Sequence, residues 1–328
     1  MRKFVALAGA LALATISLTS CSADSSNNLD PANAAFDGVK QTCATYETGK
    51  SADLINLDSA TPPKASFPVP LNSKAIETKV IKEGTGPKFT GDELVDIEFQ
   101  LYNGGTGDLI QSSKFDGTDF ASQFLKSGGS PDFCHALAGV RQGSTVAALF
   151  PAKLAHNNQG VSSLGVGAQD SIVFVFKLLK VFLPRANGET QLPQDGFPQV
   201  VLAKSGAPGL VMQDWTKPAF DQFKKATLIQ GKGDVVKEGQ VVTVHYSGWV
   251  WSDAKNKFDS SWDKGQPVQF TVAKGQVIDG FVKALVGEKV GSQVIAVIPP
   301  AEGYGAAAQG SIPANSTLIF VVDILGAN

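Results

Sequence analysis

Histidine and cysteine are scarce in this chain, which has three residues of each among 328. The histidines are scattered, and no CxxC pair or paired histidines give the spacing of a zinc site. The chain also lacks a GxSxG nucleophile motif and a block of lysine or arginine, and its net charge is −2. The sequence therefore gives no support to a metalloenzyme, a lipase-type hydrolase or a nucleic-acid-binding protein. We expect neither a cofactor nor a metal.

Charge is also absent from a stretch near the N-terminus. The chain begins Met1-Arg2-Lys3 and then runs from Phe4 to Ser20 without a charged residue. A basic start followed by a short apolar run is typical of a signal peptide, which we assign to residues 1–20. Leu18-Thr19-Ser20-Cys21 resembles the bacterial lipobox, whose cysteine takes a lipid before cleavage. An ordinary secretory signal with a chance cysteine is the alternative.

The three cysteines predict a location and a bridge. We expect Cys21 to be lipidated and the protein to lie outside the cytoplasm, anchored to the cell membrane through its acyl chains. Cys43 and Cys134 remain. Because an exported protein meets an oxidising compartment, we expect these two to form a disulfide. Two separately buried thiols are the alternative.

A repeat divides the chain. Residues 133–150 and 281–298 share the frame F-x-x-A-L-x-G-x-x-x-G-S-x-V, and each segment is followed by a proline. Pro, Gly and polar residues dominate the stretch between the copies, which predicts neither a strand nor a helix there. We predict a lipid-anchored tether and N-terminal extension over 21–66, a first copy over 67–183, a linker over 184–196 and a second copy over 197–328.

The residue pattern of each copy predicts strands with one short helix. Val242, Val244 and Tyr246 alternate with polar residues, as in a strand with one buried face, so we expect His245 to face solvent. The spacing within 281–285 is typical of one face of a short helix. One helix among several strands indicates the α+β class.

Five strings of the second copy occur in one order, at spacings typical of one family. They are Val244-His245-Tyr246-Ser247-Gly248, Phe258-Asp259-Ser260-Ser261, Val277-Ile278-Asp279-Gly280-Phe281, Gly303-Tyr304-Gly305 and Ile312-Pro313-Ala314-Asn315-Ser316-Thr317-Leu318-Ile319-Phe320. Together they resemble the FKBP family of peptidyl-prolyl cis–trans isomerases. The resemblance implies two tandem FKBP-like domains, each a twisted antiparallel sheet wrapped around one short helix. It also implies proline-containing unfolded or exported polypeptides as substrates, and macrolides as inhibitors.

Rotation about an X–Pro bond must overcome a barrier of about 18–20 kcal/mol, which comes from amide resonance. An apolar pocket favours the less polar twisted amide, so no covalent intermediate is needed. The resemblance implies catalytic roles for Asp259, Tyr304 and Tyr246, with the Tyr304 hydroxyl as a donor to a substrate carbonyl. It implies substrate binding by Phe258, Val268, Phe270, Val277, Ile278, Phe281, Ile312 and Phe320, the backbone N–H of Ile278 included.

The first copy lacks this polar equipment. Phe99 stands in place of Tyr246, Gln111 in place of Asp259, and His156 in place of Tyr304. A lone histidine in a loop is more often neither a donor nor a metal ligand. We interpret this copy as a degenerate module that spaces the domains or grips unfolded clients.

Two functions fit the sequence. The first is a monomeric, anchored isomerase that speeds proline-limited folding of exported proteins, a step that takes tens of seconds unaided. The second is a non-catalytic lipoprotein chaperone or interaction module. Intact Asp259 and Tyr304 favour the first function, whereas the altered first copy favours the second.

Overall fold

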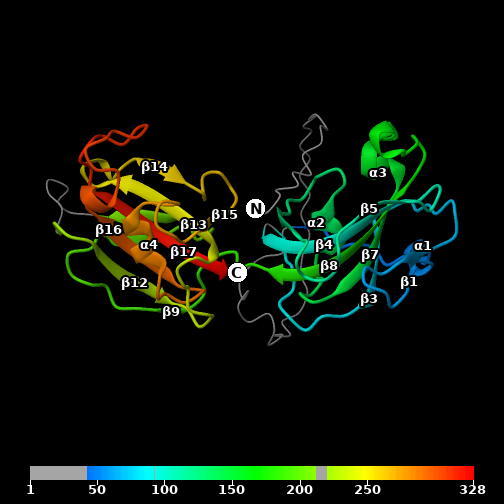
Figure 1. Cartoon of the computed structure of the whole chain (residues 1–328), viewed down its shortest axis with the longest axis horizontal. Helices are drawn as coiled ribbons and strands as arrows, with labels where there is room; N and C mark the ends of the chain where they lie inside the picture. The colour runs from blue at the N-terminus through cyan, green and yellow to red at the C-terminus, as the bar shows by residue number, and fades with distance from the viewer. Residues whose placement is uncertain (1–42, 92, 212–219) are drawn as a thin grey trace.

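A computed structural model describes residues 43–91, 93–211 and 220–328. Two sheets occupy the two halves of the molecule, and the C-terminus lies between them (Figure 1). The predicted signal peptide and the predicted lipidation site at Cys21 lie outside the described residues. Among the described residues, no helix is both long enough and apolar enough to cross a membrane.

The first sheet is antiparallel and has the strand order β3-β7-β8-β4-β5, with β6 also pairing with β4. Helix α2 packs its apolar residues on one face of this sheet, in the larger of the two apolar clusters of this half. The elements are β3 (Glu77–Lys82), β4 (Leu94–Asn103), β5 (Leu109–Ser112), β6 (Ala121–Phe124), α2 (Phe133–Leu137), β7 (Thr145–Phe150), α3 (Ala152–His156), η2 (Ser162–Leu164) and β8 (Ile172–Val181).

The second sheet repeats this order as β12-β16-β17-β13-β14, with β15 also pairing with β13. Helix α4 packs on the equivalent face (Figure 1). The match of strand order, pairing and helix position confirms the predicted α+β class with one fold present twice. The elements are β12 (Lys224–Gln230), β13 (Val241–Val250), η3 (Trp251–Asp253), β14 (Lys257–Ser260), β15 (Val268–Thr271), α4 (Asp279–Leu285), β16 (Gln293–Ile298), η4 (Pro300–Glu302) and β17 (Leu318–Ala327).

Each sheet also carries a small hairpin on the face opposite its helix. In the first half, α1 (Lys50–Asp53), β1 (Asn56–Leu57) and β2 (Ala65–Ser66) adjoin a cluster that contains sheet residues such as Val173. In the second half, the hairpin of β10 (Gln199–Leu202) and β11 (Pro208–Val211) packs beside Trp249. The repeated unit is therefore larger than the sheet and its helix, and the described part of the predicted N-terminal extension packs with the first half.

The prediction that residues 184–196 form no strand is wrong. β9 (Glu189–Thr190) pairs antiparallel with β12 and extends the second sheet by one short edge strand. Before it, the N–H of Ala186 donates to Asp323 Oδ2 at 2.8 Å. The open edge of β12 and the buried Asp323 carboxylate both need hydrogen-bond donors. The backbone of this segment supplies them, although its composition predicts no strand.

The two halves meet where β8 and β17 end. Lys180 Nζ donates to the carbonyl of Ala327 at 2.8 Å, and Asn328 Nδ2 donates to Asp96 Oδ2 at 3.2 Å. Phe182 is 1% exposed, and its ring lies against Gly326, where a Cβ would come within 2.5 Å of it. This contact requires glycine at position 326 because a side chain would push the ring away.

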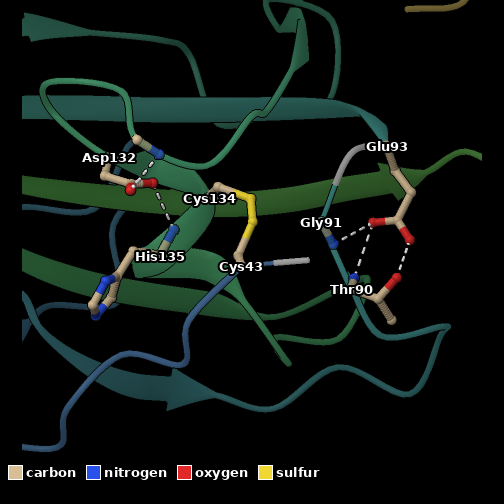
Figure 2. The surroundings of a disulfide bond; sticks show 8 residues. Cys43, Thr90, Gly91, Glu93, Asp132, Cys134 and His135 are labelled. Atoms are coloured by element: carbon tan, nitrogen blue, oxygen red, sulfur yellow. Dashed lines mark hydrogen bonds between the residues drawn. A yellow bond between two sulfur atoms is a disulfide. The ribbon is translucent and has the colours of Figure 1, made fainter. Parts of the chain in front are cut away.

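A disulfide joins Cys43 to Cys134, with the two Cα atoms 5.7 Å apart, and this is the pair expected from the sequence. It ties the first described residue to the start of α2 (Figure 2). Asp132 caps that helix, because its Oδ1 accepts the N–H of His135 at 2.9 Å. The N-terminal segment is thus fixed to the helix on which the first sheet packs.

Candidate active site

Four strands, one helix and the loops between them supply the predicted site in the second half. Gly248 of β13 lies opposite Asp259 of β14 and opposite Phe320 of β17. A Cβ at Gly248 would come within 2.5 Å of the Phe258 ring and 2.9 Å of the Phe320 ring. Glycine at this point lets the two rings meet edge-on, with centroids 5.5 Å apart.

Aromatic rings surround the helix residue Phe281. Its ring lies 5.1 Å from Phe270, 5.1 Å from Phe320 and 6.2 Å from Tyr246, in edge-on arrangements. The apolar residues predicted to bind substrate all belong to, or pack against, the one apolar cluster that contains Phe281. They are Phe258, Val268, Phe270, Val277, Ile278, Phe281, Ile312 and Phe320, and Tyr246 joins them.

A polar array borders this cluster. The Tyr246 hydroxyl donates to Asp259 Oδ2 at 2.5 Å, and Lys264 Nζ lies 2.5 Å from Asp259 Oδ1. The N–H of Ser260 donates to the same Oδ1 at 2.8 Å. Sequence reasoning missed Lys264. Its spacing of five residues from Asp259 was the available signal, but that spacing does not show that the intervening turn folds back.

Two groups of the array, Tyr246 and Asp259, have pKa values shifted in opposite directions. Burial, followed by the hydrogen bond to Asp259, raises the pKa of Tyr246 above its usual range, so the phenol stays a donor. Burial acts to raise the pKa of Asp259 as well, but the hydrogen bonds from Lys264 and Tyr246 outweigh it and hold that pKa below its ordinary value. The carboxylate is therefore charged at neutral pH, and its two oxygens are engaged by neighbours.

Tyr304 stands apart from the apolar cluster. Its side chain is 37% exposed, in the loop between η4 and β17, and it contributes to the raised pKa of Tyr246. Just before this loop, Glu302 Oε2 of η4 lies 2.8 Å from Lys283 Nζ of α4, which ties η4 to the helix. Ile278 precedes α4 as its N-cap residue, so its N–H has no acceptor within the helix. The roles of the Tyr304 hydroxyl and the Ile278 N–H as donors to a substrate carbonyl stay predictions.

Known proteins match this half of the chain. A family model described as FKBP-type peptidyl-prolyl cis-trans isomerase matches residues 233–325. FK506-binding protein 1A of Neurospora crassa is 42% identical over 113 residues, which are 34% of this chain and 92% of that protein. FK506-binding protein of Neisseria meningitidis serogroup B is 43% identical over 99 residues, 30% of this chain and 89% of that protein. This chain belongs to the FKBP family.

It is accordingly an FKBP-type peptidyl-prolyl isomerase. A solved structure of the three FKBP domains of wheat FKBP73 also aligns with 77% of this chain and 94% of its own, at 20% identity and a TM-score of 0.35. The family assignment rests on the sequence relatives, and the repeat of the FKBP fold rests on the matching topology of the two sheets.

The first FKBP-like half packs its aromatic rings differently. Phe150 and Phe176 occupy the strand positions that Ile298 and Val322 hold in the second half. The helix residue Phe133 lies 5.8 Å from Phe150 and 5.4 Å from Phe176, and both of these rings are buried. Rings from the sheet thus pack against the helix phenylalanine, which in this half is itself only partly buried.

His156 of the first half is a structural residue. It is 1% exposed, its Nδ1 accepts the N–H of Gly160 at 3.0 Å, and its Nε2 lies 2.8 Å from the carbonyl oxygen of Asp170. These partners fix the tautomer that carries its proton on Nε2. Both ring nitrogens of His156, at the end of α3, bond to backbone groups of the segment that follows it, whereas its counterpart Tyr304 is exposed.

The expectation that His245 faces solvent is wrong. It is 7% exposed, its Nδ1 lies 2.9 Å from Ser261 Oγ, and its ring stacks on Trp262 with centroids 3.9 Å apart. Burial lowers the pKa of His245 to about 4. The alternation of β13 correctly placed His245 on the face opposite Val244, but it could not show that the 261–266 turn covers that face.

Proposed function

We propose that the second FKBP domain isomerises X–Pro bonds of exported polypeptides, and that Cys21 anchors the protein by a lipid to the outer side of the cell membrane. The signal-peptide pattern and the lipobox-like Leu18-Thr19-Ser20-Cys21 support the export and the anchor. The Cys43–Cys134 disulfide supports an oxidising compartment.

Catalysis in this proposal is electrostatic and needs no covalent bond to the protein. Planar X–Pro amides are more polar than twisted ones, so an apolar surface of Phe281, Phe320 and Phe270 disfavours the ground state more than the transition state. The Tyr304 hydroxyl and the Ile278 N–H hold substrate carbonyls while the bond turns. Rotation then proceeds without water at the reacting amide.

Asp259 has a positioning task in this mechanism. Its oxygens already accept from Tyr246 and Ser260 and pair with Lys264, so it has little capacity left to act as a base. It instead sets the angle of the Tyr246 ring beside Phe281. The observation that carries the proposal is this Tyr246–Asp259–Lys264 array at the border of the apolar cluster, because the first half has the fold without the array.

A protease-free peptide isomerisation assay on the full-length protein tests the proposal. We expect Asp259→Leu to lower kcat/KM by about tenfold or more, because it breaks both contacts of the array. Gln111→Leu changes the equivalent residue of the first half and serves as the matched control, with wild-type activity expected. Equal activity of the two variants would show that the catalytic site lies elsewhere.

Processing of the N-terminus tests the anchor independently. Cys21→Ala should leave the protein uncleaved or release it from the membrane fraction, because the acylated thiol is lost. Fractionation of cells followed by intact-mass measurement distinguishes these states. A Cys21→Ala protein that is still cleaved before residue 21 and remains in the detergent phase would exclude the lipid anchor while leaving the isomerase proposal intact.

A further inference from the structure

Ser261 makes hydrogen bonds to the backbone of Tyr246. The N–H of Tyr246 donates to Ser261 Oγ at 2.8 Å, and the N–H of Ser261 donates to the carbonyl of Tyr246 at 3.0 Å. His245 Nδ1 lies 2.9 Å from the same hydroxyl. The imidazole, the serine and the tyrosine backbone therefore form one connected network on the face of the sheet away from α4.

Trp262 supports this network from outside. Its ring lies parallel to that of His245, with an interplanar angle of 19° and centroids 3.9 Å apart. It also lies against Gly206 at the tip of the β10–β11 hairpin, where a Cβ would come within 3.0 Å of Trp262 and 3.2 Å of Arg185. Arg185 Nη1 donates to the carbonyl of Lys204 at 3.4 Å, so the linker meets the tip of the hairpin at the point where Trp262 contacts it.

These supporting segments lie outside the part of the chain that the family model matches, residues 233–325. Gly206 has a φ of +97°, which any side chain would strain, so the close approach to Trp262 uses a position suited to glycine. The indole Nε1 of Trp262 is buried and has no acceptor among the described residues. The residue thus contributes through ring contact rather than through a hydrogen bond.

The first half keeps the serine contact but not the rings. The N–H of Phe99 donates to Ser113 Oγ at 3.1 Å, and the N–H of Ser113 donates to the carbonyl of Phe99 at 2.8 Å. Glu98 takes the place of His245, and its carboxylate instead pairs with Lys177 Nζ at 3.0 Å. The serine contact belongs to the fold, whereas the stacked histidine and tryptophan accompany the half that carries the Tyr246–Asp259–Lys264 array.

We propose that His245 and Trp262 are positioning residues for isomerisation, which brace the Tyr246–Asp259–Lys264 array against the linker and the β10–β11 hairpin. Trp262 lies between Asp259 and Lys264 in one turn, so a shift of its ring moves both ends of that ion pair. His245 fixes the hydroxyl that holds Tyr246. Small displacements of groups that orient a substrate lower the rate strongly. The inference rests on the proposed site, and it adds the linker at Arg185 and the hairpin tip at Gly206 to what sets the activity of that site.

Three variants of the full-length protein separate the contacts of the brace. His245→Phe keeps a ring to stack on Trp262 and loses Nδ1, His245→Asn keeps a polar atom near Ser261 and loses the stack, and Trp262→Ala removes the stack and the hairpin contact. Val201→Ala is the control, because this side chain of β10 is 47% exposed. Melting temperature and near-ultraviolet circular dichroism verify that each variant is folded.

We expect Trp262→Ala to lower kcat about tenfold and each His245 variant to lower it about threefold to fivefold, with KM little changed because the Phe281 surface is untouched. Val201→Ala should match wild type. Wild-type kcat in Trp262→Ala and His245→Phe, beside a loss in Asp259→Leu, would overturn the brace and leave the proposed site standing. Full activity in Asp259→Leu would overturn both. A rise in KM with unchanged kcat would assign these residues to substrate binding and also overturn the brace.

Discussion

The two halves share a strand order but place their aromatic rings differently. In the second half, Tyr246 and Phe270 stand around Phe281, whereas in the first half Phe150 and Phe176 pack against Phe133 from within the sheet. Beneath its helix the first half therefore has two sheet rings, Phe150 and Phe176, where the second half has the aliphatic Ile298 and Val322. The comparison shows that the fold alone does not determine whether an active site is present. A few side chains on the same strands make the difference.

The outer faces of the sheets differ at one cross-strand pair. Glu98 lies opposite Lys177 in the first half, and His245 lies opposite Asp323 at the same position of the second. The first pair forms its own ion pair. Asp323 instead accepts from Ala186 of the linker, and His245 contacts the 261–266 turn, so the second outer face depends on segments around it.

Truncating the helix phenylalanine of each half should separate packing from catalysis. Phe281→Ala and Phe133→Ala each remove a ring that contacts several others. Truncating the buried Phe281 should cost about 3–5 kcal/mol in unfolding free energy of its half, and truncating the partly exposed Phe133 should cost its half less. Only Phe281→Ala should lower kcat/KM, measured at a temperature where both variants are folded. Equal losses of activity would mean that the first half also acts on the substrate.

Removing the disulfide should affect one half and spare the other. Cys43→Ser combined with Cys134→Ser opens a bridge between residues 91 positions apart, which should cost the first half about 2–5 kcal/mol. Denaturant unfolding followed with and without reductant measures the loss. Isomerase activity at low denaturant is the internal control, and its collapse along with the first half would show that the two halves unfold as one unit.

Acidification should destabilise the second half through His245. Its folded pKa of about 4 lies below its ordinary value of 6.5, so the neutral form is favoured in the folded state. The corresponding stability is fully present above pH 6.5 and is lost as the pH falls from there through 4, by about 3 kcal/mol in total. His245→Phe should remove this slope, and Glu98→Gln in the first half should not. Unfolding titrations between pH 4 and 7 that run parallel for His245→Phe and wild type would contradict the expectation.

The smallest effect should come from the exposed tyrosine of the active-site loop. Tyr304→Phe keeps the ring and removes one donor, which should cost about 0.5–1.5 kcal/mol of transition-state stabilisation, or about twofold to tenfold in kcat/KM. His156→Gln in the first half is the matched variant, and it should lower stability without changing the rate. An unaltered rate in Tyr304→Phe would remove its hydroxyl from the mechanism.

Residue patterns within a segment, and the order of the motifs, predicted the secondary structure and the candidate site residues. The alternation along β13 and the short helix over 279–285 follow from side-chain period, and the juxtaposition of Tyr246 with Asp259 follows from the family resemblance. The tandem repeat was also visible, because residues that pack one fold recur in the same order.

What the sequence did not reveal depends on which segment covers which surface. Alternation indicates that His245 leaves the Val244 face, but burial of the opposite face requires the 261–266 turn and the β10–β11 hairpin to pack there. Lys264 reaches Asp259 only because that turn folds back. β9 forms because an edge of β12 is open to it. Each of these contacts joins two segments that are separate in the sequence, and neither segment's own residues show that it will be covered by the other.

The Cys43–Cys134 bridge also has a mechanical consequence. A pulling force between residue 43 and a polypeptide held by the second half enters the protein at α2, through the bridge, as well as along the backbone. The intervening chain, with α1, the β1–β2 hairpin and strands β3 to β6, forms a covalently closed loop. While the bridge is intact, this loop cannot be extended to its full length by the force. The force is then carried by the rest of the first half, between Cys134 and the isomerase domain.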